Sequence, residues 1–264
     1  MNSLIELDHV TKAFGGLIAV KELSFQVGEG LIVGLIGPNG SGKTTVFNLI
    51  SGVYKPDKGS ILFAGRKVSG KKPHVMAQLG VGRTFQTVRP FSTMNVIENV
   101  AVGGLFGRNH SLSVGRANDK AEEILAYVGL TEKSRMPAGA LTLAEQRRLE
   151  LGRALSANPR FLMLDELMAG LTHTEISQTL DFLRRLSQER GITLLVIEHV
   201  MKAIIQLCEN VVVLDHGEKI AEGSPSQVIS DEKVIRAYMG EKATRGKDQS
   251  PFCGKADRSP KTDN

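Results

Sequence analysis

The sequence predicts an α/β fold with a parallel sheet at its core, and three apolar runs indicate it. Residues 31–36, 161–164 and 192–197 are short, predominantly apolar segments of the kind that form fully buried strands. Helical spacing follows each of the first two, for example at Val46, Leu49 and Ile50. Strands that alternate with helices are typical of a parallel sheet covered by helices.

The first of these runs leads into a loop with the pattern G-x-x-x-x-G-K-[ST]. Glycines allow the backbone to curl and to bring its N–H groups close to an anion, and the helix that follows adds the positive end of its dipole. Lys43 is placed to reach the β- and γ-phosphates of a nucleotide, and the Thr44 hydroxyl is placed to bind Mg²⁺. We expect phosphate binding from Gly37, Pro38, Asn39, Gly40, Ser41, Gly42, Lys43, Thr44 and Thr45.

The N-terminal third predicts a second, strand-rich unit. Residues 4–33 are typical of short strands with turns, since Leu23, Phe25 and Val27 alternate with polar residues. A further strand is expected at 60–65. Phe14 precedes two glycines in an expected loop, where the ring could stack on a base or belong to the core.

Residues 91–150 differ from this strand-rich part because helical patterns dominate them. A helix is expected at 93–101, a loop rich in Gly, Ser and basic residues at 103–116, and a further helix around 121–128 that Gly129 closes. We interpret residues 91–150 as a helical subdomain inserted into the α/β core.

The second half of the chain continues the α/β pattern. Thr172 and Glu175 form a capping box before a helix that ends at Gly191. A hairpin turn is expected at 215–217 and a last helix at 231–239, and Cys208 is expected to be a small core residue on a helix face.

Composition excludes several classes of protein. No apolar run in the 264 residues approaches the length needed to span a bilayer, and the first residues lack the pattern of a signal peptide. Two distant cysteines, Cys208 and Cys253, suit a reducing cytosol. Much of the net charge of +5 lies in the tail 242–264, which we expect to be disordered and solvated. Contact of this basic tail with anionic lipid or nucleic acid is the alternative.

Polar residues end two of the predicted buried strands. Asp165 and Glu166 follow one strand and His199 follows another. Because the carboxyl ends of parallel strands share one edge of the sheet, these groups should meet the phosphate loop. Asp165 would hold Mg²⁺ through water, Glu166 would activate the attacking water, and His199 would bond the γ-phosphate. The sequence therefore predicts a site that hydrolyses nucleotides.

These motifs together resemble an ATP-binding-cassette (ABC) ATPase over residues 4–241. The resemblance implies a P-loop NTPase (RecA-like) core with an antiparallel β subdomain and the inserted α-helical subdomain. It also implies the following site assignments: an aromatic A-loop at Phe14, Walker A at 37–45, the Q-loop at Gln86, the signature at Thr142, Leu143, Ala144 and Glu145, Walker B at Asp165 and Glu166, and the H-loop at His199. Thr44, Gln86 and Asp165 are the implied Mg²⁺ ligands.

Several stretches resemble one subfamily, the ATP-binding subunit of branched-chain amino acid importers. They are 14–20, Arg83-Thr84-Phe85-Gln86, 235–240, Arg-Arg-Leu-Glu after the signature and Ile-Glu-His at the H-loop. The resemblance implies a head-to-tail dimer with a second ATP-binding subunit, a copy of itself or a paralogue, in which each ATP lies between one Walker A and the other signature. It further implies two membrane permease subunits, a substrate-binding protein that acts indirectly, and a peripheral position on the cytoplasmic face of the plasma membrane. Residues 87–110 would help form the groove for a permease helix.

The sequence departs from the family pattern at the signature. Leu143 and Ala144 replace two glycines, and Leu167, Thr172 and Val200 replace a proline and two aspartates. A Cβ at residue 144 would crowd a γ-phosphate. We therefore hypothesise that the composite site completed by residues 142–145 is the slower of two unequal sites, whereas two equally active sites are the alternative.

Two other functions remain open from the sequence. Similar cassettes serve other cargoes, such as urea, other amino acids or exported lipopolysaccharide. An ABC ATPase acting on nucleic acid is a second alternative, but the separation of Gln86 and Thr142 leaves no room for the long coiled coil usual there. We expect no nucleic-acid partner.

Overall fold

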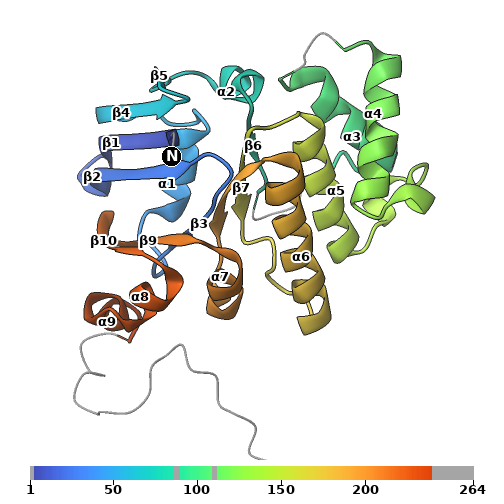
Figure 1. The fold of residues 1–264 in the computed structure, drawn as a ribbon. Coiled ribbons are helices and arrows are strands. Elements are labelled where there is room, and N and C mark those ends of the chain that lie inside the picture. The colour runs from blue at the N-terminus through green and yellow to red at the C-terminus, as the bar shows by residue number, and fades with distance from the viewer. Residues whose placement is uncertain (1–2, 86–89, 109–111, 240–264) are drawn as a thin grey trace, which may run out of the picture.

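The computed structural model describes residues 3–85, 90–108 and 112–239. Gln86, Cys253 and the predicted basic tail 242–264 lie outside these described residues. Figure 1 shows a central sheet with an antiparallel sheet and α1 on one side and helices α5 and α6 on the other. None of the described helices is both long and apolar enough to cross a membrane.

The central sheet has six strands in the order β10-β9-β3-β8-β7-β6. Their bounds are β3 Ile32–Ile36, β6 Val81–Arg83, β7 Phe161–Asp165, β8 Thr193–Ile197, β9 Asn210–Asp215 and β10 Glu218–Gly223. β9, β3, β8, β7 and β6 pair in parallel, and β10 is antiparallel to β9. Every residue of β3, β7 and β8 is buried, which confirms the prediction of buried strands.

The core lies on both faces of this sheet. In β7, Leu162 and Leu164 belong to the cluster on the helical face, whereas Phe161 and Met163 belong to the cluster shared with α1 and the antiparallel sheet. Successive side chains of a strand point to opposite faces, so one strand supplies both clusters. The sheet is therefore held from both sides, and its carboxyl edge is left for the polar site.

The antiparallel sheet has the order β2-β1-β4-β5. Its strands are β1 Ser3–Phe14, β2 Leu17–Gly28, β4 Lys58–Phe63 and β5 Arg66–Lys67. The prediction of several short strands in residues 4–33 was wrong, because two strands of 12 residues form one hairpin with its turn at 15–16. Leu23, Phe25 and Val27 are buried, which confirms their alternation.

Helices lie between and after the strands of the central sheet along the chain. They are α1 Lys43–Ile50, α2 Pro73–Leu79, α6 His173–Arg190, α7 Met201–Leu207, α8 Pro225–Ser230 and α9 Glu232–Met239, and α8 and α9 follow the last strand of the sheet, β10. The capping box at Thr172 and Glu175 begins α6, and Gly191 in the left-handed region ends it, as predicted. The sequence pattern missed α2 and α8, which are 7 and 6 residues long.

Helices α3 Val96–Phe106, α4 Val114–Tyr127 and α5 Leu143–Ser156 pack beside the sheet, with the 3-10 turns Thr131–Lys133 and Ala138–Ala140 between them. The predicted loop at 103–116 was wrong at both ends, since α3 continues to Phe106 and α4 begins at Val114. The physical reason is that Gly103 serves helix packing. A Cβ there would lie 2.2 Å from the Arg153 carbonyl oxygen and from Ser156 Oγ.

The close approach of α3 and α5 gives a testable pair of variants. Gly103→Ala should destabilise the protein by about 1–3 kcal/mol, because the added methyl group overpacks this helix contact. Gly115→Ala, on α4, meets no atom within 4 Å and should be neutral or stabilising by up to about 1 kcal/mol. Urea denaturation of both variants measures the effect. Equal stabilities of the two would contradict this role for Gly103.

Candidate functional site

The phosphate-loop pattern forms a tight loop between β3 and α1. Gly37, Gly40 and Gly42 have φ values of 152°, 81° and 102°, which side chains rarely allow. A Cβ on Gly37 would lie 2.1 Å from the Leu214 carbonyl oxygen, and one on Gly42 would lie 2.5 Å from the Ala19 carbonyl oxygen. The loop is therefore fixed against both sheets, and its glycines leave the backbone open to a ligand.

The side chain of Lys43 lies over this loop and is only 7% exposed. Its ammonium donates hydrogen bonds to the Gly37 and Pro38 carbonyl oxygens at 2.8 and 2.9 Å. Burial lowers the pKa of Lys43, and the nearby Glu166 and Asp165 oppose that shift. A buried cation beside a glycine-rich backbone and a helix N-terminus fits the phosphates of a nucleotide.

All nine predicted loop residues lie in the loop between β3 and α1 or in the first turn of α1. They are Gly37, Pro38, Asn39, Gly40, Ser41, Gly42, Lys43, Thr44 and Thr45.

Asp165 ends β7, and its carboxylate is buried at the carboxyl edge of the sheet. It pairs with Arg83, whose Nη2 lies 3.3 Å from Oδ2. Burial raises the pKa of Asp165, and the Arg83 guanidinium opposes that shift. Thr44 and Asp165 line the same cleft of about 690 Å³. Carboxylate and hydroxyl oxygens are donors that a hard divalent cation prefers, so these two residues fit such an ion beside a phosphate.

Glu166 and His199 meet as predicted, with His199 Nε2 2.7 Å from Glu166 Oε1. Glu166 has a φ of 50°, an unusual conformation for a residue other than glycine. Its N–H donates to the Ile197 carbonyl oxygen at 2.9 Å. Arg147 Nη1 donates to the carbonyl oxygens of Glu166 and Leu167 at 2.7 and 3.3 Å. These bonds hold the unusual backbone and aim the carboxylate at His199.

Glu198 is a third carboxylate at this edge, and sequence reasoning gave it no role. Its side chain is buried and accepts a hydrogen bond from the Met168 N–H at 2.8 Å. Burial raises the pKa of Glu198 to about 7, and the charge of Glu166 adds to the shift. Sequence patterns also gave no role to Arg147. Only the fold shows that Arg147 is the buried arginine of α5.

Phe14 lies at the end of β1 and is 41% exposed. Its ring contacts Tyr54 edge-on with centroids 5.0 Å apart, and the Lys12 ammonium lies 5.4 Å from its centroid. The core alternative for Phe14 was therefore wrong. An exposed ring remains available for stacking on a base.

Residues 142–145 form the N-terminus of α5. Thr142 and Glu145 make a capping box, and Glu145 also pairs with Lys133, which lowers the pKa of Glu145 to about 2. Leu143 is exposed, and Ala144 lines a cavity of about 390 Å³ between α5 and α6. Within the described residues of one chain, no hydrogen bond or ion pair joins 142–145 to the phosphate loop. Gln86 lies outside the described residues.

Comparison with known proteins decides the family. The model of the family described as ABC transporter matches residues 20–169. The chain is 39% identical over 250 residues to the high-affinity branched-chain amino acid transport ATP-binding protein BraF of Pseudomonas aeruginosa, covering 90% of this chain and 98% of that protein. The chain belongs to the ABC transporter family. A second model, of the branched-chain amino acid ATP-binding cassette transporter, matches residues 218–244 of this cassette.

Other relatives and solved structures agree. The lipopolysaccharide export system ATP-binding protein LptB of Haemophilus influenzae is 33% identical to this cassette over 239 residues, covering 90% of the chain and 98% of that protein. The ADP conformation of MJ1267, an ATP-binding cassette of an ABC transporter, superposes with a TM-score of 0.81 at 31% identity. The match covers 91% of this chain and 100% of that one. The dimeric structure of MJ0796, a bacterial ABC transporter cassette, superposes with a TM-score of 0.76 at 25% identity. The match covers 84% of this chain and 98% of that one. These neighbours confirm the ABC ATPase fold.

The pKa of Glu198 predicts a pH-dependent difference in stability. A carboxyl whose pKa rises from 4.5 to about 7 on folding stabilises the protein at low pH, and that contribution is lost as pH rises through this window. Glu198→Gln stays neutral and keeps the acceptor for the Met168 N–H. Its stability relative to the parent should therefore rise by roughly 2 kcal/mol between pH 5 and pH 8. Urea denaturation across this range measures it. Parallel stability profiles of the two proteins would contradict the shift.

Proposed function

We propose that this cassette is the ATP-hydrolysing subunit of an importer that takes up branched-chain amino acids across the cytoplasmic membrane. The observation that carries the proposal is the second family match at 218–244, since it names this cargo and lies outside the motifs shared by all cassettes. The relative BraF, whose name states the same transport, supports it over nearly the whole chain.

The chemistry proposed for the site follows from its charges. The loop N–H groups and Lys43 bind the phosphates, while Phe14 stacks on the base. Thr44 and Asp165 would hold Mg²⁺, together with Gln86 from the proposed Q-loop. The ion neutralises charge on the phosphates when bound. Glu166 orients and deprotonates the attacking water, and His199, which already contacts Glu166, bonds the γ-phosphate.

We also propose a head-to-tail dimer with a second cassette, either a copy or a paralogue. Each phosphate loop would then meet residues 142–145 of the partner, because no hydrogen bond or ion pair among the described residues joins 142–145 to the loop of their own chain. The N-terminus of α5 would present Thr142 and the backbone N–H groups of Leu143 and Ala144, which lie outside the capping box, to the nucleotide. The cassette MJ0796, which is dimeric, supports this assembly. Leu143 and Ala144 in place of glycines support two unequal sites.

Two permease subunits are the proposed mechanical partners, and a substrate-binding protein would act through them. The cleft between the core and α3 exposes two large apolar side chains, Phe85 at 54% and Phe106 at 70%. Exposed aromatic residues of this kind suit a partner helix. We therefore propose a peripheral position on the cytoplasmic face of the plasma membrane.

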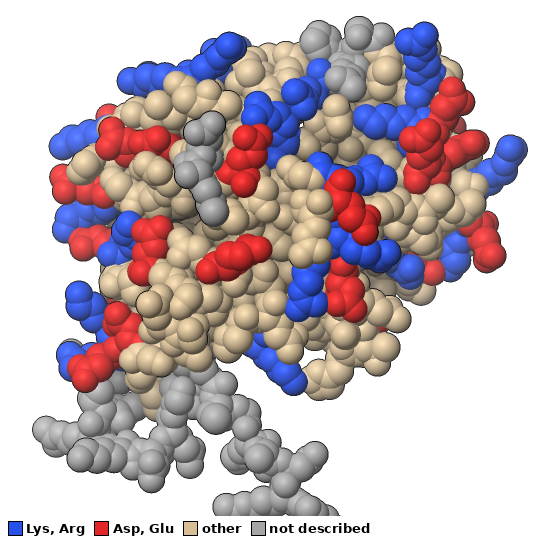
Figure 2. Space-filling model, viewed as in Figure 1, with Lys and Arg blue, Asp and Glu red and all other residues tan. Residues whose placement is uncertain are grey.

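Other cargoes and partners have weaker support. Similarity to LptB suits lipopolysaccharide export, but the match at 218–244 favours amino acids, and urea has no support beyond the shared fold. A nucleic-acid partner would call for a basic surface. Figure 2 shows acidic and basic side chains intermixed over the face that it displays.

The test is ATP turnover by the complete transporter in proteoliposomes, with the cassettes, both permeases and the binding protein. Leucine on its binding protein should raise turnover, because transport and hydrolysis are coupled. Turnover that ignores leucine, isoleucine and valine but responds to another cargo would contradict the proposed substrate.

Glu166→Gln in this assembly should lower turnover by about 10²–10⁴-fold while ATP still binds. Glu189→Gln, at the exposed end of α6, is the control and should leave turnover unchanged. In a mixed dimer, Glu166→Gln on this chain and the equivalent change on the partner should cause unequal losses. Equal losses would overturn the proposal of unequal sites.

A further inference from the structure

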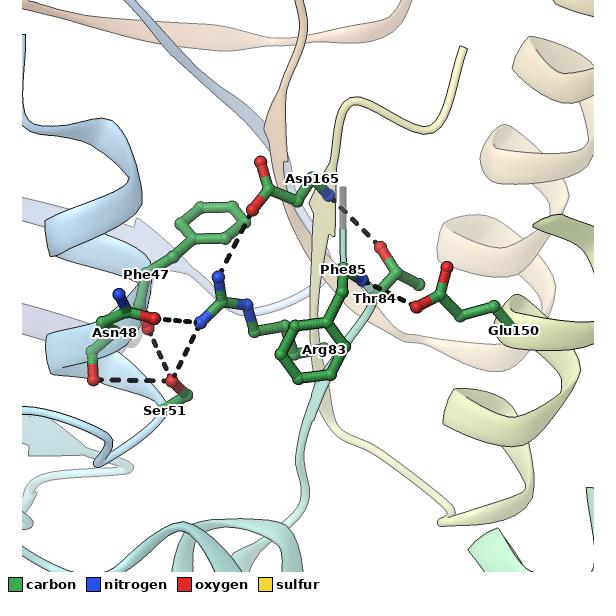
Figure 3. A network of polar contacts seen from close by, with 8 residues as sticks. All are labelled: Phe47, Asn48, Ser51, Arg83, Thr84, Phe85, Glu150 and Asp165. Atoms are coloured by element: carbon green, nitrogen blue, oxygen red, sulfur yellow. Dashed lines mark hydrogen bonds and ion pairs between the residues drawn. The ribbon is translucent and has the colours of Figure 1, made fainter. Parts of the chain in front are cut away.

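Arg83 is the last residue of β6, and its side chain is only 9% exposed. Figure 3 shows the guanidinium between α1 and the end of β7, pointing at residues from both. A buried arginine needs partners for its charge and its donors. The partners of its two terminal nitrogens lie in α1, at the C-cap of α1 and at the end of β7.

The two terminal nitrogens of Arg83 bind different elements. Nη1 donates to Asn48 Oδ1, in the last turn of α1, at 2.6 Å and to Oγ of Ser51, the C-cap residue of this helix, at 3.3 Å. Nη2 lies 3.3 Å from Asp165 Oδ2 at the end of β7. Because the guanidinium is planar and rigid, anchoring one nitrogen on α1 fixes the other against the carboxylate.

Aromatic rings hold the same guanidinium from the sides. Its central carbon lies 5.5 Å from the centroid of Phe47, on α1, and 4.9 Å from that of Phe85. Contacts of a desolvated guanidinium with ring faces stabilise it and restrict its orientation. Arg83 therefore occupies one position rather than a set of surface rotamers.

The residues that follow Arg83 hold Asp165 and α5 through further bonds. Thr84 Oγ1 accepts a hydrogen bond from the Asp165 N–H at 3.2 Å. The Phe85 N–H donates to Glu150 Oε1, on α5, at 2.9 Å. The backbone of Asp165 is thus fixed by Thr84, and its carboxylate is fixed by Arg83 alone among the described residues.

We propose that Arg83 is a positioning residue that holds the Asp165 carboxylate for Mg²⁺. This rests on the metal-binding role proposed above for Asp165. The ion pair takes Oδ2 and leaves Oδ1 to the ion or its water, so that the carboxylate does not rotate away. The rigid fork between Asn48 and Asp165 ties this orientation to α1, the helix that also carries Thr44.

The experiment measures binding of a fluorescent ATP analogue to the full chain as a function of Mg²⁺, in a Glu166→Gln background without hydrolysis. With Arg83→Met, the Mg²⁺ concentration that gives half of the Mg²⁺-dependent gain in affinity should rise about tenfold or more. Affinity measured in EDTA should stay unchanged, because the phosphate loop is intact. Arg83→Lys keeps the charge but not the planar, two-pronged guanidinium. Its Mg²⁺ requirement should lie between those of the parent and of Arg83→Met.

Asn48→Ala separates positioning from a simple charge effect. Asn48 does not touch Asp165, so a raised Mg²⁺ requirement in this variant must pass through Arg83. Arg160→Met is the matched control, since Arg160 also carries an ion pair, with Glu29, and a ring contact, with Phe63, and lies away from the cleft. It should leave the Mg²⁺ requirement unchanged.

An unchanged Mg²⁺ requirement in Arg83→Met would overturn the proposal. A lower requirement would also overturn it, because it would show that Arg83 competes with the ion for the carboxylate. Equal losses with Mg²⁺ and with EDTA would also overturn it, because they would indicate a merely structural role. Asp165→Asn distinguishes failure of the metal-binding role proposed for Asp165 from failure of the positioning role proposed for Arg83. If that variant keeps the full Mg²⁺ effect, the proposed function of Asp165 fails. If it loses the effect and Arg83→Met does not, only the role of Arg83 fails.

Discussion

The buried ammonium of Lys43, held by carbonyl oxygens of its own loop, is the interaction on which the rest of the site depends. A cation that is 7% exposed is costly unless dipoles or anions surround it. The Gly37 and Pro38 carbonyl oxygens supply those dipoles. They are in place because Gly37 and Gly42 fit the loop tightly against β9 and β2, so the two sheets together fix the position of one charge.

The carboxylates beyond Lys43 follow the same constraint, since each buried charge has a partner from another element. Arg83 pairs with Asp165, and Arg147 holds the backbone of Glu166. Helix α5 contributes near both carboxylates. Its Arg147 bonds the backbone of Glu166, and its Glu150 accepts a hydrogen bond from the Phe85 N–H, two residues after Arg83. Helix α5, which has Thr142 as its N-cap, therefore contacts the surroundings of both carboxylates, and any tilt of α5 would reach them directly.

The sequence predicted the parts of this arrangement that local patterns encode. The apolar runs of β3, β7 and β8, the tight glycine-rich loop before α1 and the box that caps α6 each depend on residues close together in the chain, and the structure confirms the conformation of each. Phosphate binding by that loop stays a prediction. The prediction failed at 103–116 because Gly103 serves a contact with α5, which no local pattern shows. Arg83 and Arg147 were missed for the same reason. Their roles arise from burial against residues up to 82 positions away.

The most direct test of the account is a crystal structure of the cassette with a non-hydrolysable ATP analogue. In that structure the Lys43 ammonium should leave the Gly37 and Pro38 carbonyl oxygens and lie within hydrogen-bonding distance of phosphate oxygens. The loop backbone should stay as it is. A nucleotide bound with Lys43 still on those carbonyl oxygens, or bound away from the loop, would contradict the central claim that this buried charge is held ready for phosphate.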